Sequence, residues 1–358
     1  MRTLASFWRD IAIAIVALAV LVYVGIAAET PWTRDFLTSL FAYGLLAMSL
    51  NLLIGTTGLV SFGHAAFFAL GGYAFGLLLQ SSGFLATFGP GAVPVAFVLA
   101  VAITAVWALV VGLICARLSE IYFAFLTLAF QMFLYSVVLS WVGLTGGDQG
   151  LMGGIPRPVF LGIDLSDPIH RFVFCAAVFV VSILVLRVVT ASPFGYTLRL
   201  IRDNPRRAAF LGINVLRAKV ISFVLAGSVA SVGGIILALF TSGAYPEWMY
   251  WSQSGQAIFM IMLGGINQFF GPLLGAVLLR FLNDMVLAYT EYTELATGVA
   301  ILLVVLGLRR GILDFVVDLV RNRRERTQQS EASASLKRGP DVSPDNKAAT
   351  LETVTPRA

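Results

Sequence analysis

The sequence is poor in charged residues and in the residues that most enzymes use for catalysis. Charged side chains make up 12% of its 358 residues, about half the fraction of a typical soluble domain. It has only two histidines, and no Cys/His pair, carboxylate pair or serine motif is set up for catalysis. It also lacks the G-x-x-x-x-G-K-[ST] loop that holds nucleotide phosphates. We therefore expect no catalytic residue, and any ATP that drives this protein must be hydrolysed on another subunit.

Cysteine is scarce as well, since Cys115 and Cys175 are the only two and both lie inside apolar runs. Such cysteines are typically small buried residues, so neither a disulfide nor a metal site is predicted. No cofactor is indicated. The net charge of +5 does not indicate nucleic-acid binding, because the basic residues gather in loops and in the C-terminal tail.

Hydrophobic residues are abundant and account for 58% of the chain. Several apolar runs exceed the roughly 18 residues that mark a membrane-spanning helix, which predicts an all-α polytopic membrane protein with about ten spans (8–10). The candidate spans are 11–28, 36–54, 58–80, 92–115, 119–142, 170–190, 217–242, 254–267, 271–288 and 294–308. The short run 254–267 ends at Gly264-Gly265, which is typical of a broken or re-entrant helix.

Lysine and arginine are distributed unevenly between the loops on the two sides of these spans. With a cytoplasmic N-terminus, twelve of them fall on the inner side and only Arg34, Arg157 and Arg171 on the outer side. The positive-inside rule then places both termini and the loop 191–216 in the cytoplasm, and 143–169 and 243–253 outside. A multi-pass membrane protein follows, and the family resemblance given below implies a bacterial inner membrane for it.

Three parts of the chain differ in composition. Residues 1–35 hold a first span and a short outer loop, and residues 36–312 hold the remaining spans. Residues 313–358 soon become polar, with almost no large apolar side chains from Arg321 onward. We expect this tail to be largely disordered in the cytoplasm, with its arginines able to contact anionic membrane lipid.

The polar, basic stretch 193–214 lies between two long apolar segments. Leu198 and Ile201 share one face of a first short helix with Phe194, whereas Arg199 and Arg202 share another face. A docking surface for a partner protein is one interpretation. A basic anchor that only sets the membrane topology is the other.

A second short helix is predicted directly after the first. Asn204 is a good N-cap, Pro205 suits the first helical position, and Gly212 suits the exit. A helix over 205–211 would be roughly 10 Å long at 1.5 Å rise per residue. Such a short, capped helix could transmit a push from a partner protein.

Polar residues at membrane depth mark a second region, 51–76. Asn51, Ser61 and His64 are functional candidates, because polar groups are costly inside a membrane. The favoured alternative for His64 is a hydrogen bond to a neighbouring helix, which is a structural role. Gly72 and Gly76 form a small-residue packing pattern between helices.

Two further stretches of the chain, 143–154 and 264–275, are rich in glycine. The outer segment 143–154 contains Gly146, Gly147, Asp148 and Gly150, and either lines the outer mouth of a pathway or is an ordinary flexible turn. The segment 264–275 carries the packing pattern Gly271-x-x-x-Gly275. Arg280 and Asp284 follow at a spacing of four, so an ion pair on one helix face is expected.

Four motifs in this order resemble the permease subunits of ABC importers for branched-chain amino acids, and the Thr-Gly-Gly motif favours the M-type branch of that family. The resemblance covers roughly 40–312. The motifs are Asn51–Gly76 with Ser-Phe-Gly-His-Ala-Ala-Phe at 61–67, Thr145-Gly146-Gly147 with Gly150, Pro193–Asn214, and Pro246-Glu247 followed by Leu263-Gly264-Gly265 and Gly271-Pro272.

The resemblance implies a heteromeric importer. A second homologous permease would complete the pathway, two ABC ATPase subunits would power it, and an extracytoplasmic solute-binding protein would deliver the substrate. Residues of 193–214 would form the segment that couples to the ATPase: Gly195, Leu198, Ile201, Arg202, Asn204, Ala208, Leu211 and Gly212. Candidate pathway or gating residues are Asn51, Ser61, Gly63, His64, Gly146, Gly147, Asp148, Gly150, Gln256, Gly264 and Gly265.

Departures from the family pattern leave the substrate open. Gln256 stands where the family often has an acidic residue, and Tyr196 and Pro205 replace common Arg and Glu. The resemblance also implies alternatives to branched-chain amino acids, because the family includes permeases for urea, short amides and other small organic solutes. An ion-coupled secondary transporter is disfavoured, because Asp284 is the only acid deep in a span and Arg280 is placed to neutralise it.

Overall fold

The computed structural model describes residues 4–27, 30–118, 120–151, 154–157, 159 and 164–289, with isolated positions 295, 298, 299, 302, 312 and 313. Helices dominate these residues, and no strand occurs among them. The first half contains α1 (Leu4–Ala27), α2 (Pro31–Asn51), the π-helix η1 (Leu52–Thr57), α3 (His64–Gln80), α4 (Ser82–Phe88), η2 (Gly89–Gly91), α5 (Ala92–Cys115) and α6 (Glu120–Ser140). The second half contains α7 (Val142–Thr145), η3 (Gly147–Gln149), α8 (Pro168–Ala191), α9 (Pro193–Asp203), α10 (Pro205–Phe210), α11 (Val215–Thr241), η4 (Pro246–Met249), α12 (Trp251–Gly264) and α13 (Gly271–Tyr289).

Among the residues that the structure describes, six helical segments are long and apolar enough to cross a membrane, which confirms an all-α multi-pass membrane protein. They are 9–27, 31–57, 82–115, 121–140, 168–191 and 215–241. The helix α3 is apolar too, but has only 17 residues. Most of the predicted span 294–308 and the tail from Asp314 onward lie outside the described residues, so the total of about ten spans stays a prediction.

The predicted span 58–80 begins too early. The preceding helix continues through η1 to Thr57, and the chain then runs without helix from Gly58 until α3 begins at His64. Gly58 has φ of +80°, a left-handed conformation that ends the helical path. This non-helical segment is tolerated inside the bundle because protein surrounds it: Leu59, Ser61 and Gly63 are buried.

At the centre of the bundle, α11 packs against α3, α2 and α5. Its contact with α3 is close enough to exclude side chains. A Cβ atom on Gly234 would lie 1.7 Å from the backbone oxygen of Phe68, and one on Gly71 would lie 2.4 Å from that of Ser231. Small residues let two membrane helices approach in this way, because no hydrophobic driving force brings them together in lipid.

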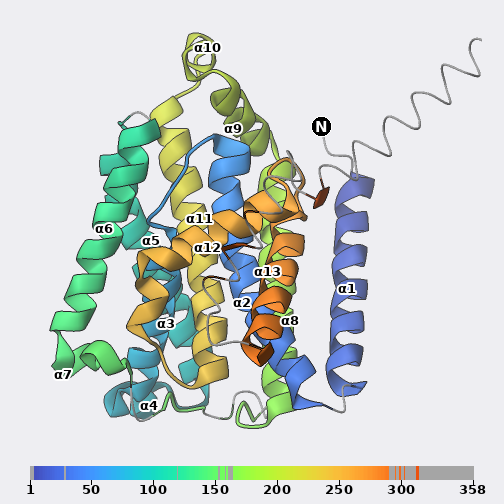
Figure 1. The fold of residues 1–358 in the computed structure, drawn as a ribbon, viewed down its shortest axis with the longest axis vertical. Helices are drawn as coiled ribbons and strands as arrows, with labels where there is room; N and C mark the ends of the chain where they lie inside the picture. The colour runs from blue at the N-terminus through green and yellow to red at the C-terminus, as the bar shows by residue number, and fades with distance from the viewer. Residues whose placement is uncertain are drawn as a thin grey trace, which may run out of the picture. The chain divides into compact units, whose positions relative to one another are not determined.

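A second close contact joins α12 to α13, which run side by side as a hairpin (Figure 1). A Cβ atom on Gly275 would lie 1.7 Å from the backbone oxygen of Met260, so the predicted packing pattern is confirmed. On the same hairpin, Arg280 Nε lies 3.4 Å from Asp284 Oδ1, which confirms the predicted ion pair. The bundle thus keeps two charges of its spans next to each other.

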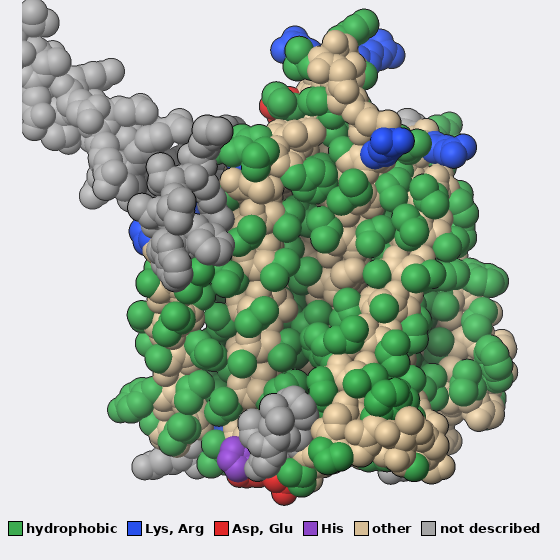
Figure 2. All heavy atoms as spheres, turned by 180° about the vertical axis from the view of Figure 1, so that it is seen from behind, with side chains coloured by type: hydrophobic (Ala, Val, Ile, Leu, Met, Phe, Trp, Pro, Cys, Tyr) green, Lys and Arg blue, Asp and Glu red, His purple; other side chains and the backbone are tan. Residues whose placement is uncertain are grey.

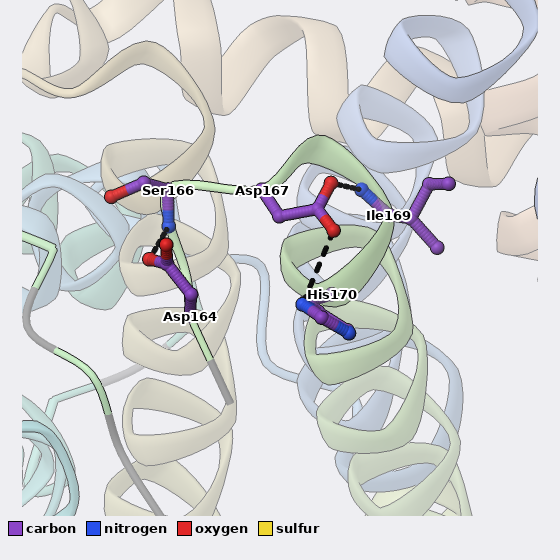
Figure 3. A network of polar contacts seen from close by, with 5 residues as sticks. All are labelled: Asp164, Ser166, Asp167, Ile169 and His170. Carbon is purple, nitrogen blue, oxygen red and sulfur yellow. Dashed lines mark hydrogen bonds and ion pairs between the residues drawn. The ribbon is translucent and has the colours of Figure 1, made fainter. Parts of the chain in front are cut away.

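The two ends of the bundle carry different charges. Lys and Arg side chains gather around α10 at one end, whereas Asp, Glu and His side chains are seen at the other (Figure 2). At that second end α8 begins with Asp167, whose carboxylate accepts from Ile169 N at 3.0 Å and lies 3.2 Å from His170 Nδ1 (Figure 3). The separation agrees with the unequal basic loops, although the cytoplasmic side itself stays a prediction.

Candidate functional site

The helix pair α9–α10 extends past the ends of the neighbouring helices (Figure 1), and its own side chains cap it. Ser192 Oγ accepts from Gly195 N at 3.3 Å, and Asn204 Oδ1 accepts from Arg207 N at 2.9 Å. Gly212 ends the pair with φ of +82°. The predicted roles of Asn204 as N-cap, Pro205 at the first helical position and Gly212 at the exit are confirmed. Because these caps are local, the pair does not need a partner to hold its shape.

The base of the helix pair is packed into the bundle. Leu198 is fully buried, and Ile201 and Ala208 are each 1% exposed. Gly195 sits so close to the end of α8 that a Cβ atom there would meet Thr190 O at 2.3 Å. A force applied to α10 would therefore reach the bundle through a packed contact and not through a flexible loop.

The tip of α10 carries two exposed apolar side chains, of which sequence reasoning named Leu211 as a coupling residue but missed Phe210. Phe210 is 92% exposed and Leu211 is 68% exposed, and the exposed Arg206 and Arg207 lie beside them. We call these four residues the α10 tip. Large apolar side chains projecting into water cost free energy unless another surface covers them. The sequence drew attention to the basic residues, whereas hydrophobicity alone would have predicted that Phe210 is buried.

Arg202 joins the helix pair to two other parts of the bundle. Its guanidinium donates to the backbone oxygen of Gly55 in η1, and to Asn267 Oδ1 at 3.3 Å in the segment between α12 and α13. We call this arrangement the Arg202 clasp. Gly58 leaves room for it, since a Cβ atom there would lie 3.1 Å from Arg202 Cγ. The arginine that was predicted to couple is thus bonded to the end of α2 and to the α12–α13 connection.

A cavity of about 660 Å³ lies next to the clasp. Residues of α2, η1, α8, α9 and the segment 266–270 line it, among them Asn51, Gly55 and Arg202. The sequence-predicted pathway residue Asn51 and the coupling residue Arg202 therefore share one cavity, although 151 positions of sequence separate them (202 − 51). We call it the basic cavity, because Arg187 and Arg199 line it as well.

His64 belongs to a different place, the buried centre. Its Nε2 lies 3.0 Å from Ser49 Oγ of α2. The next residue, Ala65, donates its backbone N–H to Ser254 Oγ at 3.0 Å, and Ser254 donates to Gln131 Oε1 at 2.9 Å. We call these contacts the central polar chain.

The predicted hydrogen bond of His64 to a neighbouring helix is confirmed, whereas its Nδ1 has no partner in the described part of the chain, and its structural role stays a prediction. Sequence reasoning missed Ser254 and Gln131, although both are polar residues within apolar helices and that signal could have found them. Gly63 packs against the same region, because its Cβ atom would meet Thr127 O at 2.2 Å. Ser61 is fully buried, and its Oγ has no hydrogen-bond partner in the described part of the chain.

The outer glycine segment is an ordered turn. Gly146, Gly147 and Gly150 all have positive φ, and a Cβ atom on Gly150 would meet the backbone oxygen of Ala244 at 2.2 Å. Leu151 N donates to the same oxygen at 2.8 Å. The glycines therefore seat this segment on the connection that follows α11, while Asp148 stays exposed.

The remaining predicted residues lie on the α12–α13 hairpin. Gln256 is half-buried on α12 and does not line the basic cavity. Gly264 ends that helix against Gly271, whose backbone oxygen would lie 1.7 Å from an added Cβ atom. Gly265 has φ of +115° and starts the segment that borders the cavity. The structure thus distributes the predicted pathway residues over four places.

The comparisons with known proteins agree on one family. The family model described as "Branched-chain amino acid transport system / permease component" matches residues 33–308. The high-affinity branched-chain amino acid transport system permease protein LivM of Escherichia coli (strain K12) is 26% identical over 307 residues, which cover 78% of this chain and 70% of that protein. LivH of the same strain is 23% identical over 283 residues, covering 76% of this chain and 91% of that protein. No solved structure matches.

Proposed function

Because the chain belongs to the branched-chain amino acid transport permease family, we propose that it is the permease subunit of an ABC importer for branched-chain or related amino acids. Its relatives are named as transport permeases, and its spans are those of a multi-pass inner-membrane protein. ATP hydrolysis then takes place on partner ATPase subunits, and a second permease completes the pathway. An extracytoplasmic binding protein delivers the substrate.

The observation that carries this proposal is the exposed α10 tip. Phe210, at 92% exposure, is the most exposed of the large hydrophobic residues described. Aromatic and arginine side chains dominate the binding energy of protein interfaces when a partner's pocket covers them. The α10 tip presents both kinds on a capped helix, so it is suited to a cleft on the ATPase. The α9–α10 end then faces the cytoplasm, as the positive-inside rule predicts.

The Arg202 clasp supplies the next step. ATP-driven movement of the ATPase displaces α10, and the packed base of α9 passes this displacement into the bundle. The clasp couples it to η1 and to the connection between α12 and α13. Those two segments border the basic cavity, so the movement reaches the bundle beside a water-accessible space. Alternating access follows when the two permeases rock together.

Reconstitution tests the function directly. The full chain, its partner permease and the two ATPases are placed in liposomes with the binding protein and labelled leucine. Uptake that requires ATP and all the components is the expected result. Uptake by this chain alone, driven by a proton or sodium gradient, would contradict the proposal and assign it to secondary transporters.

The substrate is tested in the same assay. Gln256, half-buried on α12, carries an amide where the family often has a carboxylate, and an amide cannot pair with a substrate ammonium group by charge. Uptake of branched-chain amino acids is the expected result. Preferential uptake of urea or short amides would still support an ABC importer, but would show that its substrate is not a branched-chain amino acid.

A further inference from the structure

The wall of the basic cavity is unusual in its charges. Three of its lining side chains are the arginines Arg187, Arg199 and Arg202, and no Asp or Glu is among the lining residues that the structure describes. Guanidinium groups stay protonated in proteins, so the wall carries three positive charges. A positively charged concavity attracts anions.

The arginines are held in place by neutral groups. Arg199 donates to Thr190 O at 2.6 Å and to Gly195 O at 3.3 Å, and its guanidinium lies 4.7 Å from the ring centre of Tyr196. Arg187 lies 5.2 Å from the ring centre of Phe269. Neither backbone oxygens nor aromatic rings neutralise a guanidinium. Each of these groups has five N–H donors, so Arg199 retains donors beyond the two bonds described.

A fourth polar group completes the wall. Asn51 lines the cavity and is only 9% exposed, and its Oδ1 has no hydrogen-bond partner in the described part of the chain. A buried amide oxygen without a partner costs free energy that a ligand carrying a hydroxyl or N–H group would recover. The cavity therefore offers positive charge together with a hydrogen-bond acceptor, which suits an anion that also carries a donor.

We propose that the basic cavity binds a phosphate-bearing anion, with Arg187 and Arg199 contacting the phosphate and Asn51 accepting from a neighbouring hydroxyl. About 660 Å³ is within the range of small-ligand pockets, roughly 300–1,000 Å³. The phosphate has two possible sources, a phospholipid head group or a soluble phosphate ester. Basic pockets between membrane helices bind the head groups of anionic lipids. Because α8 supplies Arg187 and α9 supplies Arg199, the bound anion ties the helix pair to the bundle.

The test measures the melting temperature of the purified, delipidated full chain by tryptophan fluorescence. Phosphatidylglycerol is titrated in one arm, glycerol 3-phosphate in a second and zwitterionic phosphatidylcholine in a third. Stabilisation by phosphatidylglycerol alone supports the site with a lipid as its ligand, and stabilisation by glycerol 3-phosphate supports it with a soluble ligand. No stabilisation by either anion, or equal stabilisation by phosphatidylcholine, overturns the proposal.

Variants locate the binding. The double variant Arg187→Gln with Arg199→Gln is expected to weaken the apparent affinity at least about tenfold, since each charge-assisted contact is worth roughly that factor. The single variant Arg187→Gln is included in case the double variant misfolds. No hydrogen bond of the described structure involves the Arg187 side chain, so this variant should fold. The matched control, Arg117→Gln with Arg217→Gln, removes two exposed charges outside the cavity and should bind like the wild type. Unchanged binding by both cavity variants would overturn the site. This test measures binding and not transport. The proposed transport function could therefore be contradicted while the anion site is supported, and the reverse.

Discussion

The central polar chain and the α10 tip both contain side chains whose polarity differs from that of their surroundings. The two regions accommodate this difference in opposite ways. In the centre, polar groups of Ser49, His64, Ser254 and Gln131 lie among apolar helices, and hydrogen bonds between helices join them, although His64 Nδ1 has no partner in the described part of the chain. At the tip, the apolar Phe210 and Leu211 project from a polar segment, and nothing in the described structure covers them. The first arrangement finds most of its partners within one chain, which favours a structural role. The second is incomplete, which indicates a partner.

The largest effect is expected where the centre is most tightly packed. Gly234→Val places a side chain against the backbone oxygen of Phe68, which lies only 1.7 Å from the Cβ position. Neither backbone can yield without separating α3 from α11, so we expect destabilisation of about 3 kcal/mol or more. Thermal unfolding in detergent measures it. Gly255→Ala is the matched control, because nothing lies within 4 Å of its Cβ position on α12. Equal melting temperatures for both variants would contradict the close packing.

The Arg202 clasp joins α9 to η1 and to the connection between α12 and α13, so breaking it should separate binding from transport. Arg202→Glu points a carboxylate at the Gly55 oxygen, which repels it. We expect ATP-dependent uptake to fall at least about tenfold, roughly the 1.4 kcal/mol of one charge-assisted bond, while the ATPase still binds. Arg217→Glu makes the same charge change in the first turn of α11 and should transport normally. Normal uptake by Arg202→Glu would remove the clasp from the coupling path.

A smaller effect is expected at the exit from α10. Gly212 has φ of +82° and nothing within 4 Å of its Cβ position, so a substitution there is strained by its backbone and not by crowding. Gly212→Val should cost about 1–2 kcal/mol locally and lower uptake several-fold by reorienting α10. Gly212→Asn should keep most of the activity, since asparagine tolerates this conformation. If valine and asparagine reduced uptake equally, the left-handed conformation would not be the reason.

The smallest effect is expected in the central polar chain. Ser49→Ala removes the hydroxyl that bonds His64, and should lower the free energy of unfolding by about 1 kcal/mol without changing the uptake of leucine. Thermal unfolding and the reconstituted assay together provide the measurement. Lost uptake at unchanged stability would reassign His64 from a structural to a transport role.

Local chemistry made part of the structure predictable. The caps of α9 and α10 involve residues three positions apart, so Asn204, Pro205 and Gly212 could be assigned from sequence. The apolar runs predicted most of the spans for a similar reason, because a helix in lipid must satisfy its backbone within itself. The break at Gly58–Gly63 was missed, since glycine and serine are common in membrane helices and do not by themselves end one.

Contacts between distant residues could not be predicted in the same way. The clasp joins positions 147 apart in sequence, and the Ser254–Gln131 bond joins positions 123 apart. No local pattern indicates such pairs. The exposure of Phe210 was missed for another reason: a single hydrophobic side chain in a short helix is usually buried, and only the folded chain shows that it projects outward.

The most direct test of the account is the affinity of the partner ATPase for this permease. Phe210→Ala with Leu211→Ala removes the apolar part of the α10 tip and leaves its caps, Arg206 and Arg207 in place. The account predicts a dissociation constant at least about tenfold higher, as for an interface hot spot, with an unchanged melting temperature. An unchanged dissociation constant would contradict the claim that the ATPase drives this permease through α10.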